Sequence, residues 1–128
     1  MTHVHLPKPL DSFVVENPTG SYKDFQLAED DDYPLRGVEF FANYGYLPGF
    51  TGEDGHDLDL FVGDAENGEC GFFIVWRNDA PKEHKFYVNM SEEQLNKTLN
   101  AYSKVLVSQE SLPDVNTVIV SIDSFKSE

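Results

Sequence analysis

The chain has little cysteine, little positive charge and no long apolar run, and each scarcity excludes a class of protein. Its 128 residues include one cysteine, Cys70, so neither a disulfide framework nor a cysteine-rich zinc site can form, and we expect a reducing, cytoplasmic compartment. The chain contains nine Lys and Arg residues and 23 Asp and Glu residues. The resulting formal charge of -14 argues against direct binding to nucleic acid or an anionic membrane. No apolar stretch reaches the length of a membrane span, and the first ten residues lack the apolar core of a signal peptide.

The composition that remains is typical of one globular domain. Hydrophobic residues make up 40% of the chain and aromatic residues 13%, enough for a core without covalent staples. We expect a single domain over residues 1–128, in which residues 1–11 form an irregular arm interrupted by Pro7 and Pro9. The excess of acids leaves three explanations open: a divalent-cation site, a basic protein partner, or solubility alone.

Periodicity predicts a β-rich α+β fold. Alternation of polar and apolar residues predicts a strand over residues 56–64, and apolar composition predicts others over 12–16, 70–78, 84–90 and 115–125. Residues 90–106 have the apolar spacing of a helix, with Ser91 as its N-cap. We therefore expect a small closed or partly closed antiparallel β-barrel, OB-like, with one main packed helix.

A cluster of acids lies where a glycine-rich turn enters the strand over 56–64. Asp57 and Asp59 share one face of that strand, and Asp54 stands in the turn before it. Carboxylates that converge raise one another's pKa unless a cation neutralises them, and Mg²⁺ prefers such oxygen ligands. The alternative is a solvated turn followed by the exposed side of an edge strand, and spacing alone leaves both open.

The residues around this cluster resemble a known family. The stretch Asn43-Tyr44-Gly45-Tyr46-Leu47-Pro48, followed by Asp54, Gly55 and Asp59, resembles the signature region of family I soluble inorganic pyrophosphatases. Further blocks at 15–21, 44–49, 57–63, 83–88 and 120–127 are similar, in order, to the pyrophosphatase-like branch found in polyvalent proteins of phages and mobile elements. The resemblance spans residues 14 to 127 and implies a small closed barrel that hydrolyses pyrophosphate or a nucleotide-like substrate with Mg²⁺, or with Mn²⁺.

The resemblance also implies roles for individual residues. It assigns Tyr44 to phosphate and to catalysis, and Lys23, Arg36 and Lys85 to substrate binding. The implied metal ligands are Asp54, Asp59, Glu83, Asp79 (one position out of register) and Glu16. The middle acid of the family block is expected at position 56, where this chain has His56, followed by Asp57, and these two are the candidates for activating water.

That departure keeps two functions open. The first is a divalent-metal-dependent hydrolase of inorganic pyrophosphate or a related phosphoanhydride. The alternative is a catalytically impaired pyrophosphatase-like fold that acts as an acidic phage or mobile-element protein and binds or inhibits a basic host protein.

Overall fold

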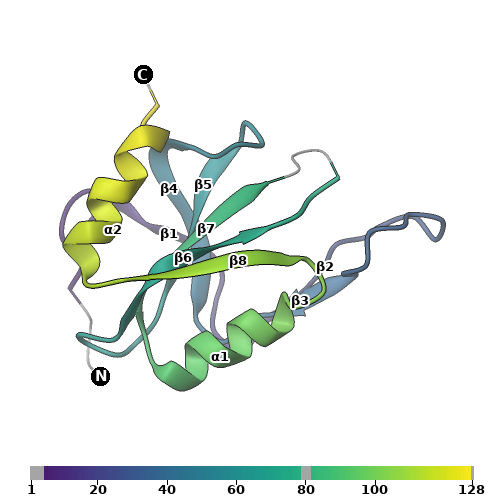
Figure 1. Ribbon diagram of the computed structural model, residues 1–128, viewed down its shortest axis with the longest axis horizontal. Coiled ribbons are helices and arrows are strands. Elements are labelled where there is room, and N and C mark those ends of the chain that lie inside the picture. Colours follow the sequence, from purple (N-terminus) through teal and green to yellow (C-terminus); the bar gives the residue numbers. More distant parts are fainter. Residues whose placement is uncertain (1–4, 79–81, 128) are drawn as a thin grey trace.

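The computed structural model, which describes residues 5–78 and 82–127, contains a large sheet, a small sheet and helices packed on them (Figure 1). Eight strands and two α-helices are present in that part of the chain. In chain order the elements are η1 (Leu10–Ser12), β1 (Val14–Asn17), β2 (Tyr22–Asp24), β3 (Gly37–Glu39), β4 (Asn43–Thr51), β5 (Asp57–Val62), β6 (Glu69–Val75), β7 (Glu83–Met90), α1 (Glu92–Ala101), β8 (Leu106–Leu112), α2 (Val115–Ile122) and η2 (Asp123–Phe125).

The mixed α+β class is confirmed, but the predicted barrel is wrong. Six strands form one sheet in the order β1-β4-β5-β7-β6-β8, and β2 and β3 form a separate two-stranded sheet. Within the described residues β1 and β8 are the edges of the large sheet and do not pair with each other, so the sheet stays open. All neighbouring pairs in the large sheet are antiparallel except β5 with β7. These two strands are parallel because β6, which follows β5 in the chain and precedes β7, runs in the opposite direction.

Two hydrophobic clusters cover the two faces of this sheet. One contains Phe61, Phe73 and Tyr87 and packs against α1 and the small sheet. The other contains Leu60 and Phe86 and packs against α2 and η1. Alternate residues of a strand face opposite sides of a sheet, so β5 and β7 contribute to both clusters.

The segment over residues 115–125 is the helix α2 followed by η2, and the predicted strand there is wrong. Its β-branched residues suggested a strand, but Val118 and Ile122 are fully buried one helical turn apart. Asp114 caps the helix, because its carboxylate accepts hydrogen bonds from the amide and the hydroxyl of Thr117. Capping and apolar spacing together outweigh the weak strand preference of valine and isoleucine.

The helix predicted over residues 90–106 is confirmed at its start and is shorter at its end. Ser91 is the N-cap, and its side chain and that of Gln94 form a capping box. The helix ends at Ala101, and Leu106 already belongs to strand β8. Within residues 5–78 and 82–127, neither helix has the length and apolar character needed to cross a membrane.

Candidate functional site

Three neighbouring strands bring polar side chains together within an apolar face of the sheet. In β5, Asp59 lies opposite Tyr46 of β4 on one side and opposite Lys85 of β7 on the other. Tyr44 precedes Tyr46 by two residues and Glu83 precedes Lys85 by two, so each shares the face of its neighbour. Strand register therefore places Tyr44, Asp59, Glu83 and Lys85 beside one another.

Lys85 stands at the centre of this group. Its ammonium nitrogen Nζ donates to the hydroxyl of Tyr44 at 2.7 Å and to Oδ2 of Asp59 at 2.9 Å, and lies 3.6 Å from Oε1 of Glu83. The rings of Tyr44 and Tyr102 lie under it, with centroids 5.0 and 5.5 Å away. Only 6% of the Lys85 side chain is exposed, and a buried charge of this kind is stable only with such partners. Lys85 therefore supplies the positive charge next to Asp59 and Glu83 that the sequence suggested would come from a metal ion.

Burial and the neighbouring charges set the protonation of the two carboxylates. Burial raises the pKa of Asp59, but the charge of Lys85 and a hydrogen bond with Glu83 outweigh that effect, and the pKa is lowered. Burial raises the pKa of Glu83 to about 7, because Lys85 offsets only part of the desolvation and Asp59 opposes ionisation. Burial lowers the pKa of Lys85, but Asp59 and the other partners raise it well above its ordinary value. Asp59 and Lys85 therefore form an ion pair, and Glu83 exchanges its proton near neutral pH.

The two tyrosines at the site keep their protons. Burial raises the pKa of Tyr44 well above its ordinary value and that of Tyr102 to about 12. The ring of Tyr44 stacks on Phe40, with centroids 4.9 Å apart and planes at 15°, and leans on Phe61 at 4.5 Å. These contacts hold the phenol of Tyr44 beside Lys85.

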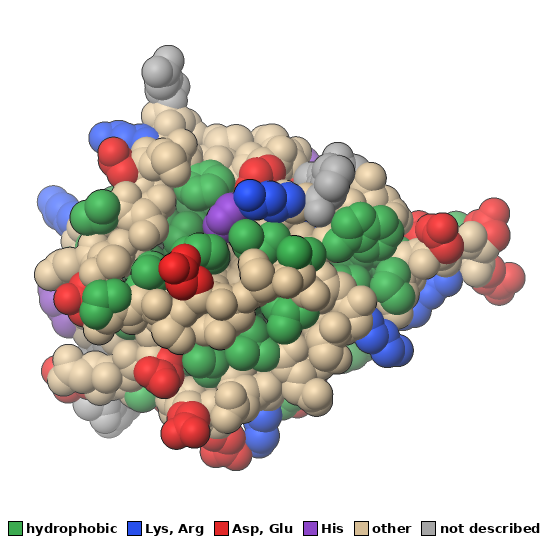
Figure 2. All heavy atoms as spheres, viewed as in Figure 1, with side chains coloured by type: hydrophobic (Ala, Val, Ile, Leu, Met, Phe, Trp, Pro, Cys, Tyr) green, Lys and Arg blue, Asp and Glu red, His purple; other side chains and the backbone are tan. Residues whose placement is uncertain are grey.

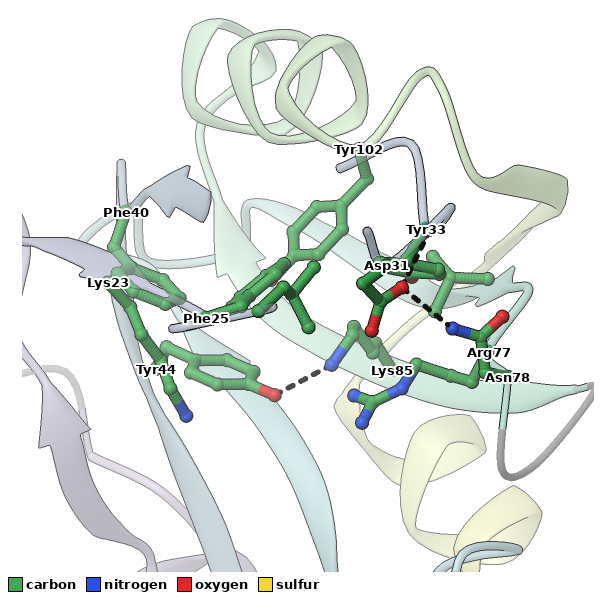
Figure 3. Close-up of a pocket in the computed structure, with 12 residues that line it drawn as sticks. Lys23, Phe25, Asp31, Tyr33, Phe40, Tyr44, Arg77, Asn78, Lys85 and Tyr102 are labelled. Atoms are coloured by element: carbon green, nitrogen blue, oxygen red, sulfur yellow. Dashed lines mark hydrogen bonds between the residues drawn. The ribbon is translucent and has the colours of Figure 1, made fainter. Parts of the chain in front are cut away.

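A cavity of about 360 Å³ opens next to Lys85 (Figure 3). Among the described residues, three cationic side chains line it: Lys23 from β2, Arg77 from the segment after β6, and Lys85 from β7. Asp31 is the carboxylate among its lining residues, and one of its oxygens accepts hydrogen bonds from the amide of Tyr33 and from Asn78. The remaining lining residues are Phe25, Leu27, Tyr33, Phe40, Tyr44, Val75, Asn78 and Tyr102.

The loop between β2 and β3 forms one wall of the cavity. Its tip projects from the molecule at the right of Figure 1, and Figure 2 shows acidic side chains gathered there. The guanidinium of Arg36 donates to the carbonyl oxygens of Ala28 at 2.8 Å and Asp31 at 2.5 Å, which fixes the curve of the loop. The hydroxyl of Tyr33 donates to the carbonyl of Trp76 at 2.7 Å and ties the loop to the end of β6. Arg36, predicted as a substrate ligand, thus shapes the loop and is not among the residues that line the cavity.

Among the described residues, the other predicted site residues make no hydrogen bond or ion pair with Lys85. Asp54 stays in its turn, where Oδ1 accepts a hydrogen bond from the amide of His56 at 3.0 Å. His56 and Asp57 are exposed at the start of β5, and Glu16 is exposed in the edge strand β1. Asp79 lies outside the described residues.

These positions test whether the carboxylates fit a resident metal ion. Glu83 already has Oε1 near Lys85 and Oε2 3.4 Å from Arg77, with only 5% of its side chain exposed. Across residues 5–78 and 82–127, no group of three or more His, Cys, Asp or Glu side chains is arranged to hold an ion. The donor set therefore does not fit a metal held jointly by Asp54, Asp59 and Glu83.

Arg77 is a cation of the cavity that was not predicted from the sequence. Strand alternation gives the signal, because Phe73 and Val75 of β6 face the same cluster, and the next residue on that face is Arg77. Trp76, between Val75 and Arg77, is 38% exposed and stacks on Tyr33 with ring centroids 5.3 Å apart, so it lies outside the core.

Comparison with known proteins finds a matching family and a similar solved structure. The family model described as Inorganic Pyrophosphatase matches residues 11–127. The chain is also similar to a crystal structure of an inorganic phosphatase from Anaplasma phagocytophilum, with a TM-score of 0.50, 15% sequence identity and 96% of each chain covered. That identity supports a common fold and no more. A search of curated proteins finds no match.

Proposed function

Because the chain belongs to the inorganic pyrophosphatase family, we propose that its cavity hydrolyses inorganic pyrophosphate or a related phosphoanhydride. The observation that carries this proposal is the convergence of Lys23, Arg77 and Lys85, from three separate parts of the fold, on one cavity. Phosphate groups need several positive charges, and catalysis of phosphoryl transfer depends mainly on positioning and on stabilising negative charge.

The residues of the site have two kinds of role in the proposed reaction: some bind the phosphate groups, and others position those that bind. Lys85, and beside it Arg77 and Lys23, would contact the phosphate oxygens and neutralise their charge. Asp59 and Tyr44 hold the ammonium of Lys85 in place, and Tyr44 also lines the cavity. The water oxygen bonds to one phosphorus while the bond from that phosphorus to the bridging oxygen breaks. The leaving phosphate keeps the electron pair and takes the proton that the water loses, so two hydrogen phosphates form.

Magnesium, or manganese, enters this proposal as the counter-ion of the substrate. Mg²⁺ is commonly bound by one or two carboxylates together with substrate phosphates, and the described carboxylates do not form a complete ion site. Calorimetric titration should therefore detect weak or no uptake of Mg²⁺ by the protein alone, and uptake together with the pyrophosphate analogue methylenediphosphonate. Tight binding of Mg²⁺ without the analogue would contradict this part of the proposal.

Phosphate release from magnesium pyrophosphate tests the activity itself. Lys23→Met removes an exposed cation from the cavity rim, and we expect kcat/KM to fall about tenfold with little change in stability, as for loss of one charge-assisted hydrogen bond. Lys97→Met is the matched control, because Lys97 is exposed on α1, where its ammonium pairs with Glu93. No phosphate release by the unmodified protein, or equal losses in both variants, would refute the proposal.

A further inference from the structure

The cavity has more apolar wall than inorganic pyrophosphate can use. Phe25 and Leu27 line it from the loop after β2 and are partly exposed, while Phe40, Val75 and Tyr102 line it from the core. Pyrophosphate contains only phosphorus and oxygen, so it cannot cover carbon surface when it binds. Binding pockets for organic ligands combine such apolar walls with a few polar groups that fix the ligand's orientation.

The cations and the rings of Phe25 and Phe40 occupy different parts of the cavity. In the close-up the nitrogen ends of Lys23, Lys85 and Arg77 lie below those two rings (Figure 3), while the ring of Tyr102 lies near Lys85, with its centroid 5.5 Å from Nζ. Asp31, whose carboxylate accepts a hydrogen bond from Asn78, also lines the cavity (Figure 3) and provides a negative charge that would repel an entirely anionic ligand. This division suits a ligand with a charged end and a flat, largely uncharged end that carries hydrogen-bond donors.

The backbone builds the apolar wall in a specific way. Gln26 has φ of 55°, in the left-handed region, and its amide donates to the carboxylate of Asp24 at 2.8 Å. The amide of Phe25 donates to the carbonyl of Arg36 at 3.0 Å. This kink at Gln26 lets Phe25 and Leu27, on either side of it, both line the cavity.

We propose that the substrate class of this site is the nucleoside diphosphate, an inference that rests on the proposed hydrolysis. The diphosphate would lie against Lys23, Arg77 and Lys85, and the base would stack against the aromatic wall. Asp31 would accept hydrogen bonds from the sugar hydroxyls or from an amino group of the base. Water attacks the terminal phosphorus, the bond from it to the bridging oxygen breaks, and the inner phosphate leaves with the electron pair and the water's proton. The products are a nucleoside monophosphate and hydrogen phosphate.

Steady-state kinetics with ADP, UDP and inorganic pyrophosphate as separate substrates test this preference. We expect kcat/KM for at least one nucleoside diphosphate to exceed that for pyrophosphate by about tenfold, the contribution of one stacked base. Phe25→Ala and, separately, Leu27→Ala should reduce that advantage about tenfold and fivefold and change the pyrophosphate value less than about twofold. Phe72→Ala is the matched control, because Phe72 is also a partly buried ring but packs on the opposite face of the sheet.

The outcomes separate this inference from the proposed function. If pyrophosphate is hydrolysed and no nucleotide is preferred, or if Phe25→Ala lowers both activities equally, the nucleotide inference is wrong while the hydrolase stands. If nothing is hydrolysed, the proposed function fails, and binding decides whether the cavity recognises a nucleoside diphosphate. The single tryptophan, Trp76, stacks on the lining residue Tyr33, so its fluorescence reports occupancy. Binding of α,β-methylene-ADP that is at least about tenfold tighter than that of methylenediphosphonate, and is lost in Phe25→Ala, supports the inference; equal or absent binding overturns it.

Discussion

Replacing Lys85 with methionine tests whether this ammonium is the cation that keeps the carboxylates together. Lys85→Met keeps an unbranched side chain but leaves Asp59, with 17% of its side chain exposed, without the charge 2.9 Å away. Breaking a buried ion pair from one side costs about 3–5 kcal/mol, since the remaining charge stays desolvated. We expect a loss of that size in the free energy of unfolding.

A double-mutant cycle separates the ion pair from simple loss of packing. Asp59→Asn alone should also destabilise, because it leaves the ammonium of Lys85 with weaker partners. The variant with both changes should recover about 2 kcal/mol or more relative to the sum of the single losses, as expected for residues in direct contact.

Urea unfolding followed by Trp76 fluorescence measures all four proteins, with Lys97→Met as the control. Lys97 and Glu93 form an exposed pair with 53% and 75% of their side chains in contact with solvent, and such pairs contribute less than about 1 kcal/mol. If Lys85→Met costs no more than Lys97→Met, or if the losses at Lys85 and Asp59 simply add, then the pair does not organise the site and this reasoning fails.

Three further outcomes follow from the same structure. Burial raises the pKa of Glu83 from 4.5 to about 7, so the protonated form of Glu83 stabilises the fold by on the order of 3 kcal/mol. This stabilisation is fully present below pH 4.5 and is lost as the pH rises through about 7. Urea midpoints should therefore fall between about pH 5 and about pH 8, and Glu83→Gln should remove this pH dependence. Gly45→Ala places a methyl group against the carbonyl oxygen of Val14, so we expect a loss of about 1–3 kcal/mol and faster hydrogen exchange in β1, while an unchanged exchange rate would contradict the packing. Ile122→Ala removes a fully buried side chain of α2 and should cost about 2–5 kcal/mol in thermal unfolding; a negligible loss would mean that α2 does not cover the sheet.

Much of the sheet could be predicted because its strands alternate in the sequence. The strands predicted over 56–64, 70–78 and 84–90 are β5, β6 and β7, within a few residues at each end. Alternation fixes which side chains share a face, and Glu83 and Lys85 of β7 do so. It does not specify which strands become neighbours, and for that reason the open sheet with edges β1 and β8 was not foreseen.

The C-terminal region shows where local preference was misleading. The valines and isoleucines of residues 115–122 suit a strand, but the cap at Asp114 and the apolar spacing favour the helix α2. Strand β8 is mostly exposed and has little apolar alternation, so the sequence carries no strong signal for it.

Part of the candidate site could be predicted from the sequence, and strand register explains which predicted residues meet and which do not. Four of the predicted site residues meet in the structure because β4, β5 and β7 are neighbours: Tyr44, Asp59, Glu83 and Lys85. Asp54 and His56 are close to Asp59 along the chain, but they precede β5 and interact with each other in the turn. Because these acids are close in the sequence, we expected them to surround an ion. In the structure Asp59 instead pairs with Lys85 of the neighbouring strand β7.

The most direct test of the account is a crystal structure of the protein with manganese and methylenediphosphonate. We predict phosphonate oxygens within hydrogen-bond distance of Lys85 Nζ and the guanidinium of Arg77, and anomalous scattering from manganese on the phosphonate itself. An analogue bound outside the cavity, or manganese held by Asp54, Asp59 and Glu83 together, would contradict the central role given to Lys85.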